Sequence, residues 1–142
     1  MIGYFDTSAI IPLVIAEPGS IRCAQAWESS DIRASSVLVI AEAHAALAQA
    51  LRLERLTQEH HRKALELLDH IVDDLALITP TRPIVDRAAG LALTHQLRGY
   101  DAIHVASAIA LDAPDLVAIT ADRRMLVALT SLGVNVIDTN PG

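Results

Sequence analysis

Acidic side chains follow two short apolar segments of the sequence at the point where each segment ends. Asp6 closes MIGYFD, residues 1–6, and Asp122 lies two residues after LVAIT, residues 116–120. Because the carboxyl ends of parallel strands meet at one edge of a sheet, we expect both carboxylates to project from the same edge. Carboxylate oxygens are the ligands that hard cations such as Mg²⁺ prefer in proteins. The two strand ends therefore indicate where metal chemistry could take place.

Two further acids can join this edge. Asp101 opens the apolar helical segment DAIHVASAIAL, and Glu42 lies inside a long helical pattern with apolar residues three and four positions away on both sides. Those neighbours share the helix face of Glu42. An ionised carboxylate on an apolar face is costly unless it is paired, hydrogen-bonded or bound to a metal. We therefore expect Asp6, Glu42, Asp101 and Asp122 to gather around one or two Mg²⁺ ions.

Each of these acids also has a purely structural explanation. Asp6, Asp101 and Asp122 precede or begin predicted helices, where aspartate is a preferred N-cap. Glu42 could face solvent in a gap of the apolar pattern. Ser8 could cap the first helix, or its hydroxyl could orient a metal-bound water beside Asp6. Capping does not explain an acid in a helix interior, so the four acids together favour the metal site.

The histidines and the cysteine are not expected to bind a metal. His104 lies one helical turn after Asp101, and we expect it to be packed in the interior or to support a ligand. His60 and His61 are adjacent in a helical segment, so they point in different directions. Cys23 is the only cysteine, which excludes an intramolecular disulfide and a cysteine-based zinc site, and we expect it to be small and buried.

Strand-like segments alternate with helical patterns along the whole chain. The patterns predict helices from Val37 onward, from an N-cap at Thr57, and from Thr81 to a C-terminal cap at Gly99. This alternation predicts an α/β domain with a mostly parallel sheet covered on both faces. The predicted strands are residues 1–6, 32–35, 75–79, 116–120 and 134–138.

Length and composition limit the class of protein. The 142 residues suit one domain, residues 1–142. Hydrophobic residues make up 52% of the chain, but no run approaches the roughly 20 apolar residues of a membrane span. No secretory signal pattern opens the sequence, so we expect a soluble cytoplasmic protein. The formal net charge of −6 argues against a broad basic surface for nucleic acid.

Four segments of the sequence resemble, in order, the signature segments of PIN-domain ribonucleases. The segments are YFDTSAII, VIAEAH, LRGYDAIHVASAIAL and AITADRRML, and they extend from residue 4 to residue 126. The resemblance is strongest to the toxins of VapBC toxin–antitoxin pairs. It implies a three-layer α/β/α sandwich with a mostly parallel sheet. It also implies that Asp6, Glu42, Asp101 and Asp122 bind Mg²⁺ or Mn²⁺, while Ser8 and Thr120 line the pocket.

The same resemblance implies an activity and partners. Proteins of this kind cut RNA, typically as dimers. A VapB-like antitoxin inhibits the toxin, and the antitoxin, not the toxin, binds DNA. The expected chemistry is attack of a metal-activated water on an RNA phosphodiester. Arg98, Arg123 and Arg124 flank two of the acids and could hold the RNA backbone, although pairing with neighbouring carboxylates explains them equally well.

Two other classes of function remain open from the sequence. Asp6 could be the nucleophile of a phosphotransferase or phosphatase. That class is less favoured, because Ser8 stands where one such family needs a second aspartate and the only lysine, Lys63, lies inside a helix. The protein could also be a non-catalytic protein-binding module, because the run AIIPLVIAEPG, residues 9–19, is apolar beyond one helical face.

Overall fold

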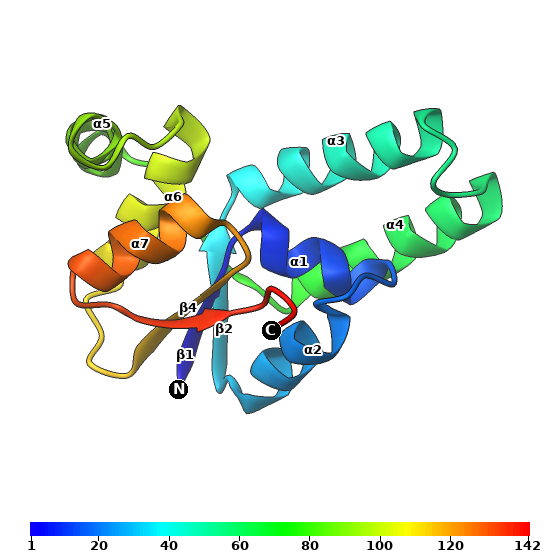
Figure 1. The fold of residues 1–142 in the computed structure, drawn as a ribbon, viewed down its shortest axis with the longest axis horizontal. Helices are drawn as coiled ribbons and strands as arrows, with labels where there is room; N and C mark the ends of the chain where they lie inside the picture. Colours follow the sequence, from blue (N-terminus) through cyan, green and yellow to red (C-terminus); the bar gives the residue numbers. More distant parts are fainter.

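The chain folds around a five-stranded sheet in which every strand is parallel to its neighbours (Figure 1). The computed structural model describes residues 1–142, and the strand order is β3-β2-β1-β4-β5. The strands are β1 Ile2–Phe5, β2 Ile32–Ser36, β3 Ala76–Ile78, β4 Leu116–Thr120 and β5 Asn135–Asp138. The five predicted strands and the mostly parallel sheet are confirmed, and β1 lies at the centre with β4 beside it.

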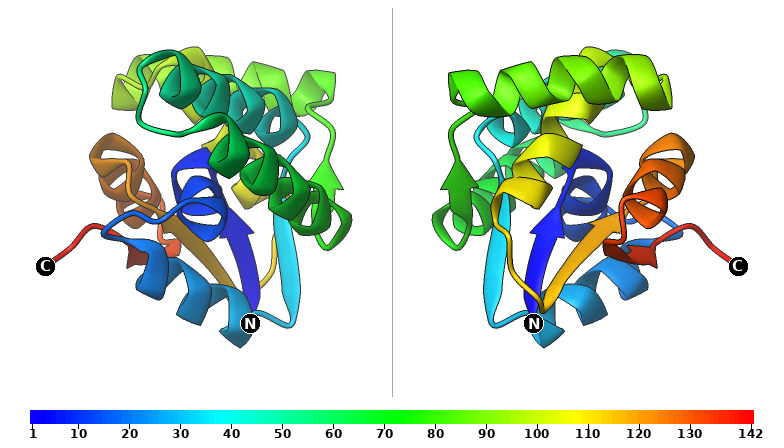
Figure 2. Two further views of the ribbon diagram at one scale, coloured as in Figure 1. Left: turned by 90° about the vertical axis from the view of Figure 1, so that its right-hand side faces the viewer. Right: turned by 90° about the vertical axis from the view of Figure 1, so that its left-hand side faces the viewer.

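Helices cover both faces of the sheet, which makes three layers (Figure 2). The helices are α1 Thr7–Val14, α2 Ser20–Ser29, α3 Leu38–Arg52, α4 Gln58–Asp73, α5 Arg82–His95, α6 Gly99–Ala110 and α7 Arg123–Ser131. One buried apolar cluster joins α1, α2, α3 and α4 to one face of the sheet, and a second joins α5, α6 and α7 to the other face. The predicted α/β/α sandwich is confirmed.

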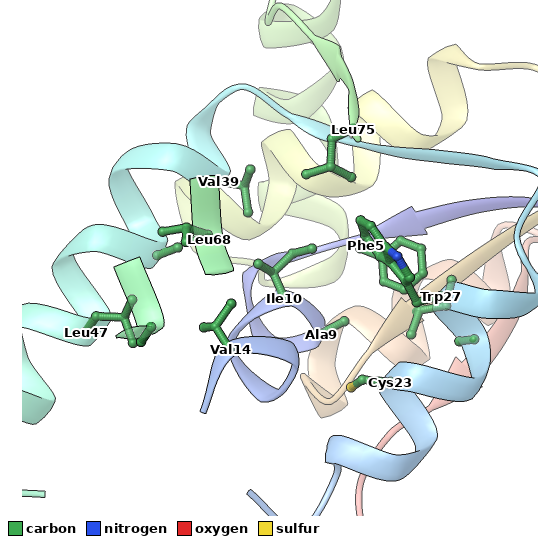
Figure 3. Packing of buried hydrophobic residues seen from close by; sticks show 14 residues of the cluster. Phe5, Ala9, Ile10, Val14, Cys23, Trp27, Val39, Leu47, Leu68 and Leu75 are labelled. Atoms are coloured by element: carbon green, nitrogen blue, oxygen red, sulfur yellow. The ribbon is translucent and has the colours of Figure 1, made fainter. Parts of the chain in front are cut away.

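Alternating side chains of the two central strands supply both clusters, because successive residues of a strand point to opposite faces. Phe5 and Ile119 belong to the cluster under α1 to α4, while Ala118 belongs to the cluster under α5 to α7. Phe5 packs edge-to-face on Trp27, with ring centroids 5.2 Å apart (Figure 3). Cys23 is buried in the same cluster, as predicted. The carboxyl ends of β1 and β4 are therefore held rigidly from both sides.

Two helix boundaries differ from the sequence prediction. The third predicted helix ends at His95, because Gln96 adopts the left-handed conformation with φ 54° and Leu97 N–H donates to the Ala92 carbonyl at 3.2 Å. Gly99 does not cap that helix: it is the first residue of α6. Asp101 consequently lies in the first turn of α6 rather than before it. No helix combines the length and apolar composition needed to cross a membrane.

Candidate active site

The Asp6 carboxylate is buried just after the end of β1 and accepts hydrogen bonds from three donors. It caps α1, since its Oδ1 accepts the Ala9 N–H at 3.1 Å. The Ser8 hydroxyl donates to Oδ1 and the Thr120 hydroxyl donates to Oδ2, both at 2.7 Å. Burial raises the pKa of Asp6, although the nearby charge of His104 and these hydrogen bonds oppose the shift. The site thus holds a carboxylate in a fixed orientation at a position that disfavours its negative charge.

Asp122 is linked to Asp6 through one side chain. It caps α7, because its Oδ1 accepts the Met125 N–H at 3.0 Å. The backbone N–H of Asp122 donates to the Thr120 hydroxyl at 3.0 Å, and that hydroxyl in turn donates to Asp6. The prediction that Asp6 and Asp122 leave the sheet at the same edge is confirmed, since β1 and β4 are adjacent and parallel.

Glu42 reaches the edge from the interior of α3, and its carboxylate is held from two sides. Its Oε1 accepts from the Thr7 hydroxyl at 2.9 Å and lies 2.6 Å from His104 Nε2. His104 is buried, and its Nδ1 lies 2.8 Å from the Tyr4 hydroxyl. Because a carboxylate only accepts, Nε2 carries the hydrogen of that contact. His104 is therefore packed and supports Glu42, as the sequence predicted.

These neighbours set the ionisation of Glu42. Burial by itself would raise the pKa of Glu42, but the hydrogen bond and charge of His104, the Thr7 hydrogen bond and the charge of Arg98 together hold it below its ordinary value. Glu42 is thus an ionised side chain in a partly buried position. The alternative in which Glu42 simply faces solvent is not what the structure shows.

Asp101 contacts a cation instead of capping a helix. The N-cap position of α6 is Arg98, which makes no side-chain capping bond. Arg98 Nε donates to Asp101 Oδ2 at 3.0 Å, and its Nη2 lies 4.0 Å from Asp122 Oδ2. The alternative explanation in which Asp101 caps this helix is wrong, because the helix begins two residues earlier. Arg98 is 78% exposed, so this pairing contributes little to stability.

Asp6 and Asp122 follow adjacent strands, and Glu42 and Asp101 line one cleft, but the four carboxylates do not gather into one cluster as the sequence analysis expected. No group of three or more histidine, cysteine, aspartate or glutamate side chains is arranged so that it could hold a metal ion in this conformation. The guanidinium of Arg98 supplies the positive charge between Asp101 and Asp122. Carboxylate oxygens are the kind of ligand that Mg²⁺ and Mn²⁺ prefer, so the donor type of these side chains fits a hard dication.

Two of the acids, Glu42 and Asp101, line an open cleft of about 990 Å³. Arg52, Arg98 and Tyr100 also contribute to its lining. Sequence reasoning did not find Arg52 or Tyr100. No local pattern in the sequence indicates these two residues, because they meet in one cleft only after α3 has packed opposite the start of α6.

Arg123 and Arg124 follow Asp122 at the start of α7 but do not line the cleft that contains Arg98. Both line a separate shallow groove of about 310 Å³, together with His95, Gln96 and Val127. The hydrogen bonds from Asn140 lower the pKa of Asp138, and the positive charge of Arg123 lowers it further. Of the three arginines named from the sequence, only Arg98 pairs with the predicted acids.

Comparison with known proteins agrees with this geometry. Residues 3–128 match the family model of the PIN domain. Ribonuclease VapC45 of Mycobacterium tuberculosis (strain CDC 1551 / Oshkosh) is 39% identical over 139 residues, which cover 94% of this chain and 92% of the relative. The solved structure of FitAcB from Neisseria gonorrhoeae superposes with a TM-score of 0.71 at 21% identity, over 98% of each chain. A toxin–antitoxin complex from Klebsiella pneumoniae gives 0.66 at 20% identity, over 99% of each chain.

The parallel sheet with acids at its carboxyl edge defines a PIN-like α/β domain. The chain belongs to the PIN-domain family, and its resemblance to the VapC ribonucleases of that family is confirmed. The alternation of strands and helices and the order of the four acidic segments were sufficient to identify this family from the sequence.

Proposed function

We propose that this protein is a divalent-metal-dependent endoribonuclease that hydrolyses RNA phosphodiester bonds and acts as the toxin of a VapBC toxin–antitoxin pair. The observation that carries the proposal is a chain of contacts among four acids of separate elements. Thr120 links Asp6 with Asp122, Arg98 lies between Asp122 and Asp101, and Glu42 lines the same cleft as Asp101. The 39% identity to a relative named as a ribonuclease supports it.

In this proposal Asp6, Asp101, Asp122 and Glu42 hold Mg²⁺ or Mn²⁺. A bound dication of this kind lowers the pKa of a coordinated water and offsets negative charge on phosphoryl oxygens. It would also relieve the repulsion among carboxylates that the protein alone balances only with Arg98 and His104.

The other side chains of the site position the acids and the substrate. Ser8 and Thr120 keep the Asp6 carboxylate in one orientation through their hydrogen bonds to its two oxygens. Thr7 and His104 do the same for Glu42. Arg98, once released from the acids, is within the cleft and can hold an RNA phosphate, for which a guanidinium has a suitable fork of donors.

We also infer that a VapB-like antitoxin binds this protein, that DNA is contacted only through that antitoxin, and that the active form is a homodimer. The structural likeness to a toxin–antitoxin complex supports the first inference. An apolar cleft of about 670 Å³ between α1, α3 and α4 offers surface for a protein partner, and the predicted apolar run 9–19 contributes Ile11, Val14 and Ile15 to it.

The test of this function is digestion of total cellular RNA by the purified protein in Mg²⁺, in Mn²⁺ and in EDTA. We expect discrete fragments with either metal and none in EDTA. Asp101→Asn should abolish the fragments, because it removes a carboxylate from the metal site. Asp69→Asn is the matched control: it makes the same change on the exposed face of α4 and should cleave like the wild type. A wild-type protein that cuts no RNA with either metal would contradict the proposal.

A further inference from the structure

The cleft beside the acids contains side chains that the metal chemistry does not use. Its lining comes mainly from α3 and the start of α6 and mixes charged, polar and apolar side chains. Beyond the candidate metal ligands it presents Gln49, Arg52 and Tyr100. Gln49 also lines the neighbouring cleft between α1, α3 and α4, so the two clefts adjoin along α3.

Tyr100 is the one aromatic side chain that the fold leaves in contact with solvent. Tyr4, Phe5 and Trp27 are buried, whereas Tyr100 is 65% exposed. It stands immediately before Asp101 in the first turn of α6 and lines the same cleft. An exposed aromatic ring beside a predicted site of RNA hydrolysis offers a surface on which a nucleic acid base can stack.

Arg52 provides a positive charge farther along the same cleft. It lies ten residues after Glu42 in α3, which places it about 15 Å further along the helix axis. Arg52 is exposed, and no carboxylate of the chain pairs with it, in contrast to Arg62 and Arg82, which form ion pairs on α4 and α5. An unpaired guanidinium in a cleft that two of the acids line is placed to hold a backbone phosphate.

We propose that Tyr100 and Arg52 are substrate-positioning residues of this cleft, with one unpaired base of the RNA stacked on Tyr100 and a backbone phosphate held by Arg52. The inference rests on the proposed function and deepens it by assigning these two residues. Duplex RNA does not fit this role, because both faces of a paired base are covered by its neighbours. A single stacking ring accepts any base, so it favours unpaired loops over a particular sequence.

The experiment measures binding of a short single-stranded RNA that carries a fluorophore and one 2-aminopurine, by anisotropy and base fluorescence. EDTA removes the metal and keeps the RNA intact, so binding is measured apart from cleavage, and low salt strengthens the binding. Tyr100→Ala should weaken binding about fivefold to hundredfold and relieve the quenching of 2-aminopurine. Tyr100→Phe should bind like the wild type, because the ring is kept. A duplex of the same sequence should compete poorly.

Arg52 is tested by the salt dependence of the same binding. Arg52→Gln should lower the slope of log affinity against log salt by about 0.7, the amount for one phosphate of a single strand. The control Arg82→Gln removes the same charge from α5, away from the cleft, and should leave the slope unchanged.

Two results would overturn the inference and leave the ribonuclease function standing, provided that the wild type cuts total RNA with metal. One is equal RNA affinity of Tyr100→Ala and the wild type. If the sedimentation of that variant also changes, the cleft is an interface between two copies of the chain. The other is equal affinity for the duplex and the single strand. If the wild type cuts no RNA, the proposed function itself fails.

Discussion

At the scale of single residues, the site places ionised groups where the protein alone stabilises them poorly. Asp6 is buried and receives only hydroxyl and backbone donors. Glu42 depends on His104, and Asp101 depends on an exposed arginine. A buried carboxylate normally needs a charged partner or a metal. The electrostatic cost at these residues is consistent with a site that is completed by a cation.

The raised pKa of Asp6 predicts a pH dependence of stability in the metal-free protein. In the native state the Asp6 carboxyl group stays protonated at pH values above 3.8, which is the ordinary pKa of this group in the unfolded chain. The free energy of unfolding therefore falls as pH rises from about 4 through the raised pKa. Asp6→Asn removes this loss, so the stability of the wild type relative to this variant should decline with pH. Urea unfolding in EDTA between pH 4 and pH 7 measures it.

Asp69→Asn serves as the control for that experiment, because Asp69 is exposed on α4. The stability of the wild type relative to this second variant should not follow the same trend. If the difference in free energy of unfolding between the wild type and Asp6→Asn stays constant with pH, the pKa of Asp6 is not raised in the native state.

His104 supports a second prediction at this scale. His104→Leu leaves the Tyr4 hydroxyl without its partner in the interior and removes the donor to Glu42. It should lower the free energy of unfolding by about 1–3 kcal/mol. His104→Gln keeps an amide that can donate to Glu42 and should lose less. Chemical unfolding of both variants checks this order, and a leucine variant as stable as the wild type would show that the buried hydrogen bonds contribute nothing.

At the scale of elements, the site depends on how closely β1 approaches its neighbours. A Cβ atom at Gly3, in the middle of β1, would collide with Ser30 Oγ and would lie 2.8 Å from Phe5 Cε2. The hydroxyl of Ser30 is itself fixed, since it donates to the Ala26 carbonyl. This central strand therefore has no space for a side chain at Gly3, and the position of Asp6 at its end follows from that close packing.

Substitution of two glycines tests this packing. Gly3→Ala should cost about 1–3 kcal/mol of stability, because the added methyl overpacks the interior. Gly90→Ala is the matched change: it lies inside α5, where an added Cβ meets nothing within 4 Å, and it should stabilise by about 0.5–1 kcal/mol. Thermal or urea unfolding compares the two, and a neutral Gly3→Ala would contradict the close approach of β1.

Local sequence signals were sufficient for the elements and insufficient for the contacts between them. The strand-end rule correctly placed Asp6 and Asp122 at one edge. Gly99 was wrongly predicted to cap α5, because α5 already ends at His95, where Gln96 adopts the left-handed conformation. The contact of His104 with Glu42 joins residues 62 positions apart. No periodicity carries information of that range, because the contact exists only once α6 and α3 have packed on the sheet.

At the scale of the whole molecule, the net charge of −6 and the proposed RNA substrate are reconciled by where the charges lie. Acids concentrate at the sheet edge, where a dication would reverse the local sign of the field. Arg52 and Arg98 lie in the cleft that Glu42 and Asp101 line. A few well-placed cations can guide a polyanion without a broad basic surface.

The most direct test of the account is calorimetric titration of the metal-free protein with Mn²⁺. The account predicts saturable binding by the wild type, weakened at least about tenfold in Asp101→Asn and unchanged in Asp69→Asn. It also predicts that saturating metal, at about a hundred times the dissociation constant, stabilises the wild type by about 2.7 kcal/mol. A wild-type protein that neither binds Mn²⁺ nor gains stability from it would contradict the claim that these four acids form a metal site.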